Sequence, residues 1–178
     1  EKLSQARGAG LADNGQIWVV TDGVFSMEGD IADLRAMRAL CDEFNAILVV
    51  DDSHGHGVMG QMGRGTHEHW GQLGKIDVLT GTLGKALGGA AGGFVAASAR
   101  AIDLLVQRGR PTLFSNALPV TVALSAETAI RILKREPQRV QRLRDNSAYA
   151  REKIRGAGFT VVESPTAICP IIVHDTAK

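Results

Sequence analysis

The stretch "NAILVVDDSHGHG", residues 45–57, joins an apolar run to a cluster of carboxylates and imidazoles. The run 45–52 predicts a buried β-strand, because it is short and dominated by apolar, partly β-branched residues. In an open α/β sheet, ligand groups gather at the carboxyl ends of parallel strands. The polar cluster stands directly after this strand. The stretch therefore predicts an α/β fold and indicates where its functional site lies.

Similar apolar runs lie on both sides of this strand and alternate with amphipathic segments. The further predicted strands are residues 16–22, 76–81 and 92–98. After the first of them, Asp30 is placed to cap a helix. The apolar residues of that helix recur at helical spacing: Ile31, Leu34, Met37, Cys41 and Phe44. The alternation predicts a mostly parallel sheet covered by helices.

Helices dominate the predictions after residue 98. One covers about 99–107, and two long ones cover 122–134 and 138–155, the last opened by Pro137. Two short strands, 159–163 and 168–173, follow. We therefore expect residues 1–136 to be part of a large domain with its connecting helix, and 137–178 to begin a smaller α+β C-terminal domain. The chain starts at Glu1 and ends just after a strand, so we expect it to be a fragment of a longer protein.

Composition excludes several classes of function. The chain has 178 residues and a formal net charge of +1, which predicts no binding to nucleic acid or to an anionic membrane surface. No apolar run approaches the roughly 20 residues that span a bilayer. Cys41 and Cys169 lie far apart, so neither a disulfide framework nor a cysteine zinc site is predicted. We expect a reducing intracellular compartment.

The cluster "DDSHGHG", residues 51–57, has three interpretations. Its carboxylates and imidazoles could bind a metal, but "HEHW", residues 67–70, lacks the second histidine of an H-E-x-x-H motif, and no metal is predicted. The residues could instead close a turn. In the third interpretation, Asp51 holds a cationic ring beside a histidine. Asp52 would then serve the loop, and His67 and His69 would lie at the surface or at a subunit contact.

The stretch "DVLTGTLGKALGGAAGGF", residues 77–94, places Lys85 among glycines. A P-loop is excluded, because Leu79 stands where a glycine is needed and Ala86 stands where a hydroxyl is needed. A lone surface lysine is the simplest alternative. Lys85 combined with Asp51 has a more specific meaning, because a lysine and an acid are what pyridoxal 5′-phosphate requires. Thr82 or Ser26 would serve its phosphate, and the glycines would allow close approach of the backbone.

Four motifs carry a resemblance to a known family. They are "TDGVFSMEGD", "VVDDSHGHGVMGQMGRGTHEHWG", "DVLTGTLGKALGGAAGGF" and "RPTLFSNALP", in this order. Together they resemble the α-oxoamine synthase family of fold-type I pyridoxal phosphate enzymes. The resemblance implies a three-layer α/β/α large domain with a mostly parallel sheet, followed by the start of the smaller domain. Glu28, where the family commonly has aspartate, and "HGHG" are departures that keep charge or small size.

The resemblance assigns roles to five residues near the two glycine-rich motifs. Lys85 is the lysine that bonds covalently to the cofactor, and Thr82 contacts the cofactor phosphate. Asp51 pairs with the pyridinium nitrogen, and His54 hydrogen-bonds the phenolic oxygen. Ser26 lies beside the ring. Lys85, His54 and Asp51 are thus the expected catalytic residues.

A sixth residue implies a partner. Ser115 in "LFSNAL" resembles a residue that reaches the phosphate of the other subunit's cofactor, so the resemblance implies a homodimer with a shared active site. The family's ring-stacking aromatic residue and its carboxylate-binding arginine have no counterparts within residues 1–178. We therefore expect the isolated segment to be weakly active at best.

Within the family, the motifs most resemble the glycine C-acetyltransferases. This implies condensation of glycine with acetyl-CoA to 2-amino-3-oxobutyrate and CoA, or the reverse reaction in threonine degradation. The alternatives are a decarboxylating member, such as 5-aminolevulinate synthase, 8-amino-7-oxononanoate synthase or serine palmitoyltransferase, and a noncatalytic metal-binding α/β domain. The expected compartment is the cytoplasm in a bacterium and the mitochondrial matrix in a eukaryote.

Overall fold

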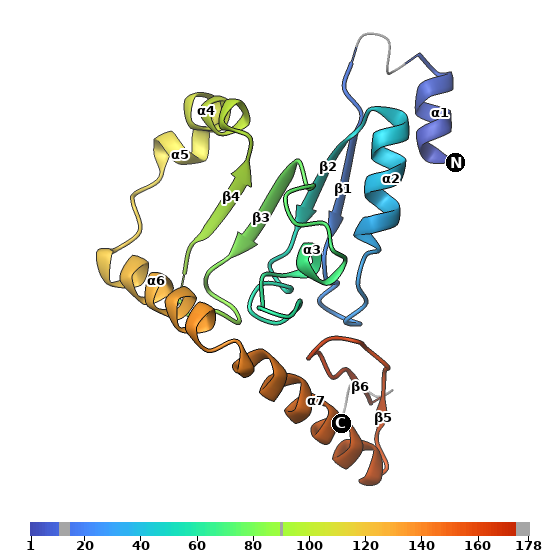
Figure 1. The fold of residues 1–178 in the computed structure, drawn as a ribbon, viewed down its shortest axis with the longest axis vertical. Coiled ribbons are helices and arrows are strands. Elements are labelled where there is room, and N and C mark those ends of the chain that lie inside the picture. The colour runs from blue at the N-terminus through green and yellow to red at the C-terminus, as the bar shows by residue number, and fades with distance from the viewer. Residues whose placement is uncertain (11–14, 90, 174–178) are drawn as a thin grey trace.

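The structure is a computed structural model that describes residues 1–10, 15–89 and 91–173 (Figure 1). One sheet has the strand order β1-β2-β3-β4, formed by Trp18–Asp22, Ile47–Asp51, Val78–Thr82 and Gly93–Ala97. The first three strands run parallel, and β4 is antiparallel to β3. The predicted mostly parallel sheet is confirmed. Each strand lies within one or two residues of its predicted bounds.

The register of the sheet places equivalent residues side by side. Asp22 at the end of β1 pairs with Asp51 at the end of β2, and Asp51 pairs with Thr80 of β3. Side chains alternate between the two faces of a strand, so these three residues share one face. The same alternation puts Asp52 on the opposite side. The carboxyl ends of the three parallel strands therefore meet at one edge, as the sequence predicts.

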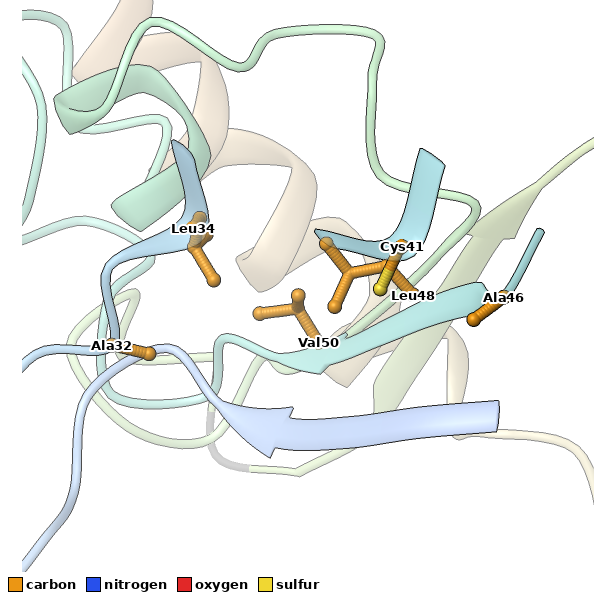
Figure 2. Packing of buried hydrophobic residues seen from close by; sticks show 6 residues of the cluster. All are labelled: Ala32, Leu34, Cys41, Ala46, Leu48 and Val50. Atoms are coloured by element: carbon orange, nitrogen blue, oxygen red, sulfur yellow. The ribbon is translucent and has the colours of Figure 1, made fainter. Parts of the chain in front are cut away.

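The main core lies between the sheet and α2, Leu34–Phe44 (Figure 2). Leu34 and Cys41 of α2 pack on Leu48 and Val50 of β2, and all four are buried. The helix does not start at the predicted cap. Asp33 caps it by accepting from the Ala36 amide, at 2.9 Å.

Asp30 and Ile31 form a different local structure from the one expected. Ile31 makes an antiparallel bridge with Val24, which holds the chain extended and excludes it from the helix. The Asp30 carbonyl accepts a hydrogen bond from the Phe25 amide. Both contacts close the loop that follows β1, so a tertiary contact has overridden the helical periodicity at this point.

The face of β1 that points away from α2 is not covered by the described residues. Trp18 and Val20 point to this face and are 57% and 69% exposed. The described residues thus form the sheet and the helix on one face of it, and the apolar side chains on the other face of β1 are exposed.

Three short helices were not expected from periodicity: α1, Lys2–Gly8, α3, Thr66–His69, and α5, Arg110–Phe114. The last two have four and five residues, too few to display a helical repeat. The longer helix α4, Ala99–Arg108, follows β4 as predicted and is capped by the Ser98 side chain.

Two long helices lead to the end of the described chain. α6, Val120–Arg135, and α7, Gln138–Gly156, are separated by Glu136 and Pro137, as predicted. The pair β5, Thr160–Val161, and β6, Ile171–Ile172, is antiparallel. The domain boundary near Pro137 remains a prediction. Among the residues described, no helix is both long enough and apolar enough to cross a bilayer.

Replacing Leu48 with alanine tests the account of the core. The side chain is fully buried between β2 and α2, so we expect a loss of about 3 kcal/mol in the free energy of unfolding. Chemical denaturation would measure the change. The matched control is Leu40→Ala, because Leu40 lies on α2 but is about half exposed. Equal losses in the two variants would contradict this description of the core.

Candidate active site

Asp51 ends β2 at the edge where the parallel strands meet. Its Oδ1 accepts a hydrogen bond from the Ser53 amide at 2.9 Å. Burial raises the pKa of Asp51, but hydrogen bonds from Ser53 and Thr80 and the charge of Lys85 outweigh it and lower the pKa below its usual value. The group is therefore an ionised carboxylate at neutral pH.

Lys85 lies in the loop after β3 and meets the loop after β2. Its Nζ is 2.9 Å from Nε2 of His54. A lysine ammonium can only donate, so His54 accepts through an unprotonated Nε2 while Lys85 is charged. Two residues separated by 31 positions thus share a hydrogen bond. The turn that carries Lys85 is closed by a bond from the Gly88 amide to the Lys85 carbonyl.

Thr82 is the last residue of β3 and lies two residues after Thr80, on the same face. Its hydroxyl donates to the Gly92 carbonyl at 3.1 Å and accepts from the Gly84 amide at 3.3 Å. Thr82 therefore shapes the loop that leads to Lys85. Contact with a phosphate would require its hydroxyl to turn away from Gly92, and this role stays a prediction.

Each of the two predicted serines lies in a turn or bend and not in a helix or strand. Ser26 is exposed, in the turn between β1 and α2. Ser115 is exposed and follows α5, which lies beyond β4 at the sheet edge remote from β1 (Figure 1). Among the hydrogen bonds of the described residues, none joins either serine to Asp51, His54 or Lys85. Their roles remain predictions.

Of the two places expected for His67, the surface is wrong, and a subunit contact stays a prediction. Its Nδ1 lies 3.6 Å from Oδ2 of the buried Asp52, and its side chain is largely covered. The short helix α3 turns it inward, and that helix gave no signal in the sequence. His69 is exposed, as expected. Asp52 serves the loop, as predicted, by accepting two hydrogen bonds from Thr66.

Thr80 is a site residue that the sequence reasoning missed. Its side chain is among the groups that lower the pKa of the Asp51 carboxylate. The signal was available, because Thr80 and Thr82 alternate along β3 and share the face of Asp51 once the strands are in parallel register.

The donor set fits pyridoxal phosphate better than a metal. An amine, an ionised carboxylate and an imidazole nitrogen converge from β2, the loop after it and the loop after β3. These groups match an aldehyde, a pyridinium nitrogen and a phenolic oxygen. Within the described ranges, no group of three or more His, Cys, Asp or Glu side chains is arranged to hold a metal ion.

Comparison with known proteins identifies the family. The family model described as "Aminotransferase class I and II" matches residues 5–178. The chain belongs to this aminotransferase class I and II family. Its relatives place it among the α-oxoamine synthases, which confirms the predicted resemblance.

Two curated members of the family are similar to this chain at comparable levels. A 2-amino-3-ketobutyrate coenzyme A ligase from Escherichia coli K12 is 41% identical over 98% of the chain and 43% of the relative. An 8-amino-7-oxononanoate synthase from Alkaliphilus oremlandii is 46% identical over 90% of the chain and 40% of the relative. The chain therefore spans less than half the length of these family members.

A solved structure from the same family confirms the fold class. A serine palmitoyltransferase from S. paucimobilis, with bound PLP, matches 98% of this chain and 45% of its own length. The TM-score is 0.87 and the sequence identity is 32%. The chain thus has the fold of the fold-type I large domain.

Proposed function

We propose that the whole protein is an acyltransferase of the α-oxoamine synthase type, which condenses glycine with acetyl-CoA to 2-amino-3-oxobutyrate and CoA, or catalyses the reverse. The observation that carries the proposal is the contact between Lys85 Nζ and His54 Nε2, formed where Asp51 ends its strand. The similarity to 2-amino-3-ketobutyrate coenzyme A ligase supports the choice of substrates.

The cofactor is pyridoxal 5′-phosphate. When bound, it supplies an electron sink that stabilises negative charge on the carbon beside the substrate amine. Three residues of this chain would hold it: Lys85 through its aldehyde carbon, Asp51 through the pyridinium nitrogen and His54 through the phenolic oxygen.

The remaining steps belong to these side chains. Asp51, ionised at neutral pH, keeps a proton on the ring nitrogen. With glycine held at the cofactor and the Lys85 amine unbonded, Nζ would take a proton from the glycine α-carbon as general base. His54 lies within hydrogen-bond distance of Nζ and orients it for that transfer. The α-carbon would then bond to the thioester carbonyl carbon, the C–S bond would break, and the CoA thiolate would leave and take up the proton held on Lys85 Nζ.

The proposal includes a homodimer in which Ser115 of each subunit reaches the phosphate site of the other. Ser115 is exposed and follows α5, and this supports a contact with the cofactor of a neighbouring subunit. Activity is proposed for the whole protein, because this chain spans less than half the length of its relatives.

A decarboxylating reaction is the second candidate, because the 8-amino-7-oxononanoate synthase is at least as similar in sequence. An assay of the whole protein with glycine, then alanine, and a series of acyl-CoA thioesters separates the two. We expect CoA release with glycine and acetyl-CoA and no release of carbon dioxide. Carbon dioxide released in step with CoA would contradict the acetyltransferase and favour the second candidate. No CoA release with any substrate pair would contradict both.

A further inference from the structure

Asp52 is fully buried and is not used by the proposed chemistry. Its Oδ2 accepts from the Thr66 amide at 2.7 Å, and its Oδ1 accepts from the Thr66 hydroxyl at 2.8 Å. Two imidazoles lie near Oδ2, with His56 Nδ1 at 3.4 Å and His67 Nδ1 at 3.6 Å. A buried carboxylate needs this number of partners, because an unpaired one would be strongly disfavoured.

Three glycines allow three chain segments to approach this carboxylate closely. A Cβ atom at Gly23, after β1, at Gly55, after β2, or at Gly65, before α3, would collide with the Asp52 carboxylate. Glycine is therefore required at each point for the loops to approach so closely. The Asp52 carbonyl also accepts from the amides of Gly55 and His56. The loop of residues 53–57 is thus hydrogen-bonded to the Asp52 carbonyl and packs against the Asp52 carboxylate at Gly55.

This loop carries His54, the residue in contact with Lys85. His54 stands between Asp52 and Gly55, so a displacement of Gly55 away from the carboxylate moves His54 with it. His56 is held on the other side, where its Nδ1 also lies 3.2 Å from the Arg64 carbonyl. Burial lowers the pKa of His56 more than the Asp52 carboxylate raises it, so this imidazole is neutral and is held by packing and by its contact with the Arg64 carbonyl.

We propose that Asp52 is a positioning residue, whose buried carboxylate gathers the loops after β1 and β2 and the start of α3, and so holds His54 against Lys85. The inference rests on the proposed function, since it takes His54 and Lys85 as cofactor residues. Asp51 and Asp52 are adjacent at the end of β2, and their side chains have different roles on the two faces of the sheet. One face binds the ring, and the other fixes the loop that frames it.

The test compares Asp52→Asn with Asp77→Asn in the whole protein. Asp77 is a suitable control because its carboxylate also accepts two hydrogen bonds, from Leu48 N and Arg38, but at the amino end of the same sheet. Three quantities are measured: the dissociation constant for pyridoxal phosphate, the visible absorption of the bound cofactor, and the thermal midpoint. The first two report the His54–Lys85 geometry, while the third reports general stability.

We expect Asp52→Asn to weaken pyridoxal phosphate binding by about tenfold or more and to lower the visible absorption of each bound cofactor. Asp77→Asn should lower the thermal midpoint and leave the other two quantities unchanged. If both variants lose only stability, Asp52 is merely structural and the inference is wrong. If the unmutated protein binds no pyridoxal phosphate, the proposed function itself is wrong and the inference fails with it.

If Asp52→Asn does not fold, the Gly55→Ala variant tests the inference through the same two measurements of the bound cofactor. Its backbone is outside the left-handed region, so alanine is permitted there and only the collision with Asp52 disturbs the loop. Gly156→Ala is the control, because a Cβ there meets open space. Weaker cofactor binding in Gly55→Ala alone supports the inference, and unchanged binding overturns it.

Discussion

Replacement of Lys85 by alanine in the whole protein is expected to abolish the visible absorption of bound cofactor and to reduce turnover by roughly 10²- to 10⁴-fold or more. The variant would lack the amine proposed both to bond covalently to pyridoxal phosphate and to act as general base. His54 would remain in place but would lose its hydrogen-bond partner at 2.9 Å. An absorption spectrum and a CoA-release assay measure the two losses.

Lys75→Ala is the matched control for this variant. Lys75 is exposed and precedes β3, whereas Lys85 follows it, so the two lysines lie at opposite ends of one strand. The control should keep both the colour and the activity. A yellow Lys85→Ala protein that still turns over glycine at the normal rate would refute the assignment of Lys85.

The second large effect is expected at Asp51. Asp51→Asn keeps the size of the side chain but removes the charge that holds a proton on the ring nitrogen, so we expect turnover to fall by about 10²- to 10³-fold. Asp22→Asn is the control, because Asp22 occupies the same register position on β1 and is exposed. Equal activity losses in both variants would show that charge at this edge, and not Asp51 itself, is what matters.

The lowered pKa of Asp51 predicts how cofactor binding depends on pH. Its pKa is depressed in the folded chain, so its charge is present through the neutral range and is lost only as the pH falls through that lowered value. We therefore expect acid to weaken cofactor binding at a pH below the usual range of aspartate. Measurement of the pyridoxal phosphate dissociation constant against pH, with Asp51→Asn as reference, tests this. Loss of binding near neutral pH that is absent in the variant would contradict it.

The sheet and the position of the site were predictable because both follow from short-range pattern. Buried strands end in polar residues, and the parallel register alone brings Asp51 beside Thr80. By contrast, the contact between Lys85 and His54 depends on the shapes of two loops. Loop shape comes from packing around groups such as Asp52, which no periodicity reports.

The misses have the same physical origin. Asp33 and not Asp30 caps α2, because Ile31 is drawn into a bridge with Val24. His67 is turned toward Asp52 by a helix of four residues. Each was decided by a contact that the periodicity of the sequence does not report. The choice of acyl substrate is less predictable still, because relatives with two different named activities match this chain at similar identity.

The covalent attachment of pyridoxal phosphate to Lys85 is the central claim, and reductive trapping tests it most directly. The whole protein is incubated with pyridoxal phosphate, reduced with borohydride, digested and mapped by mass spectrometry. The account predicts one pyridoxyl label, on the peptide that carries Lys85. A label on another lysine of the chain, such as Lys75 or Lys134, or no label despite bound cofactor, would contradict it.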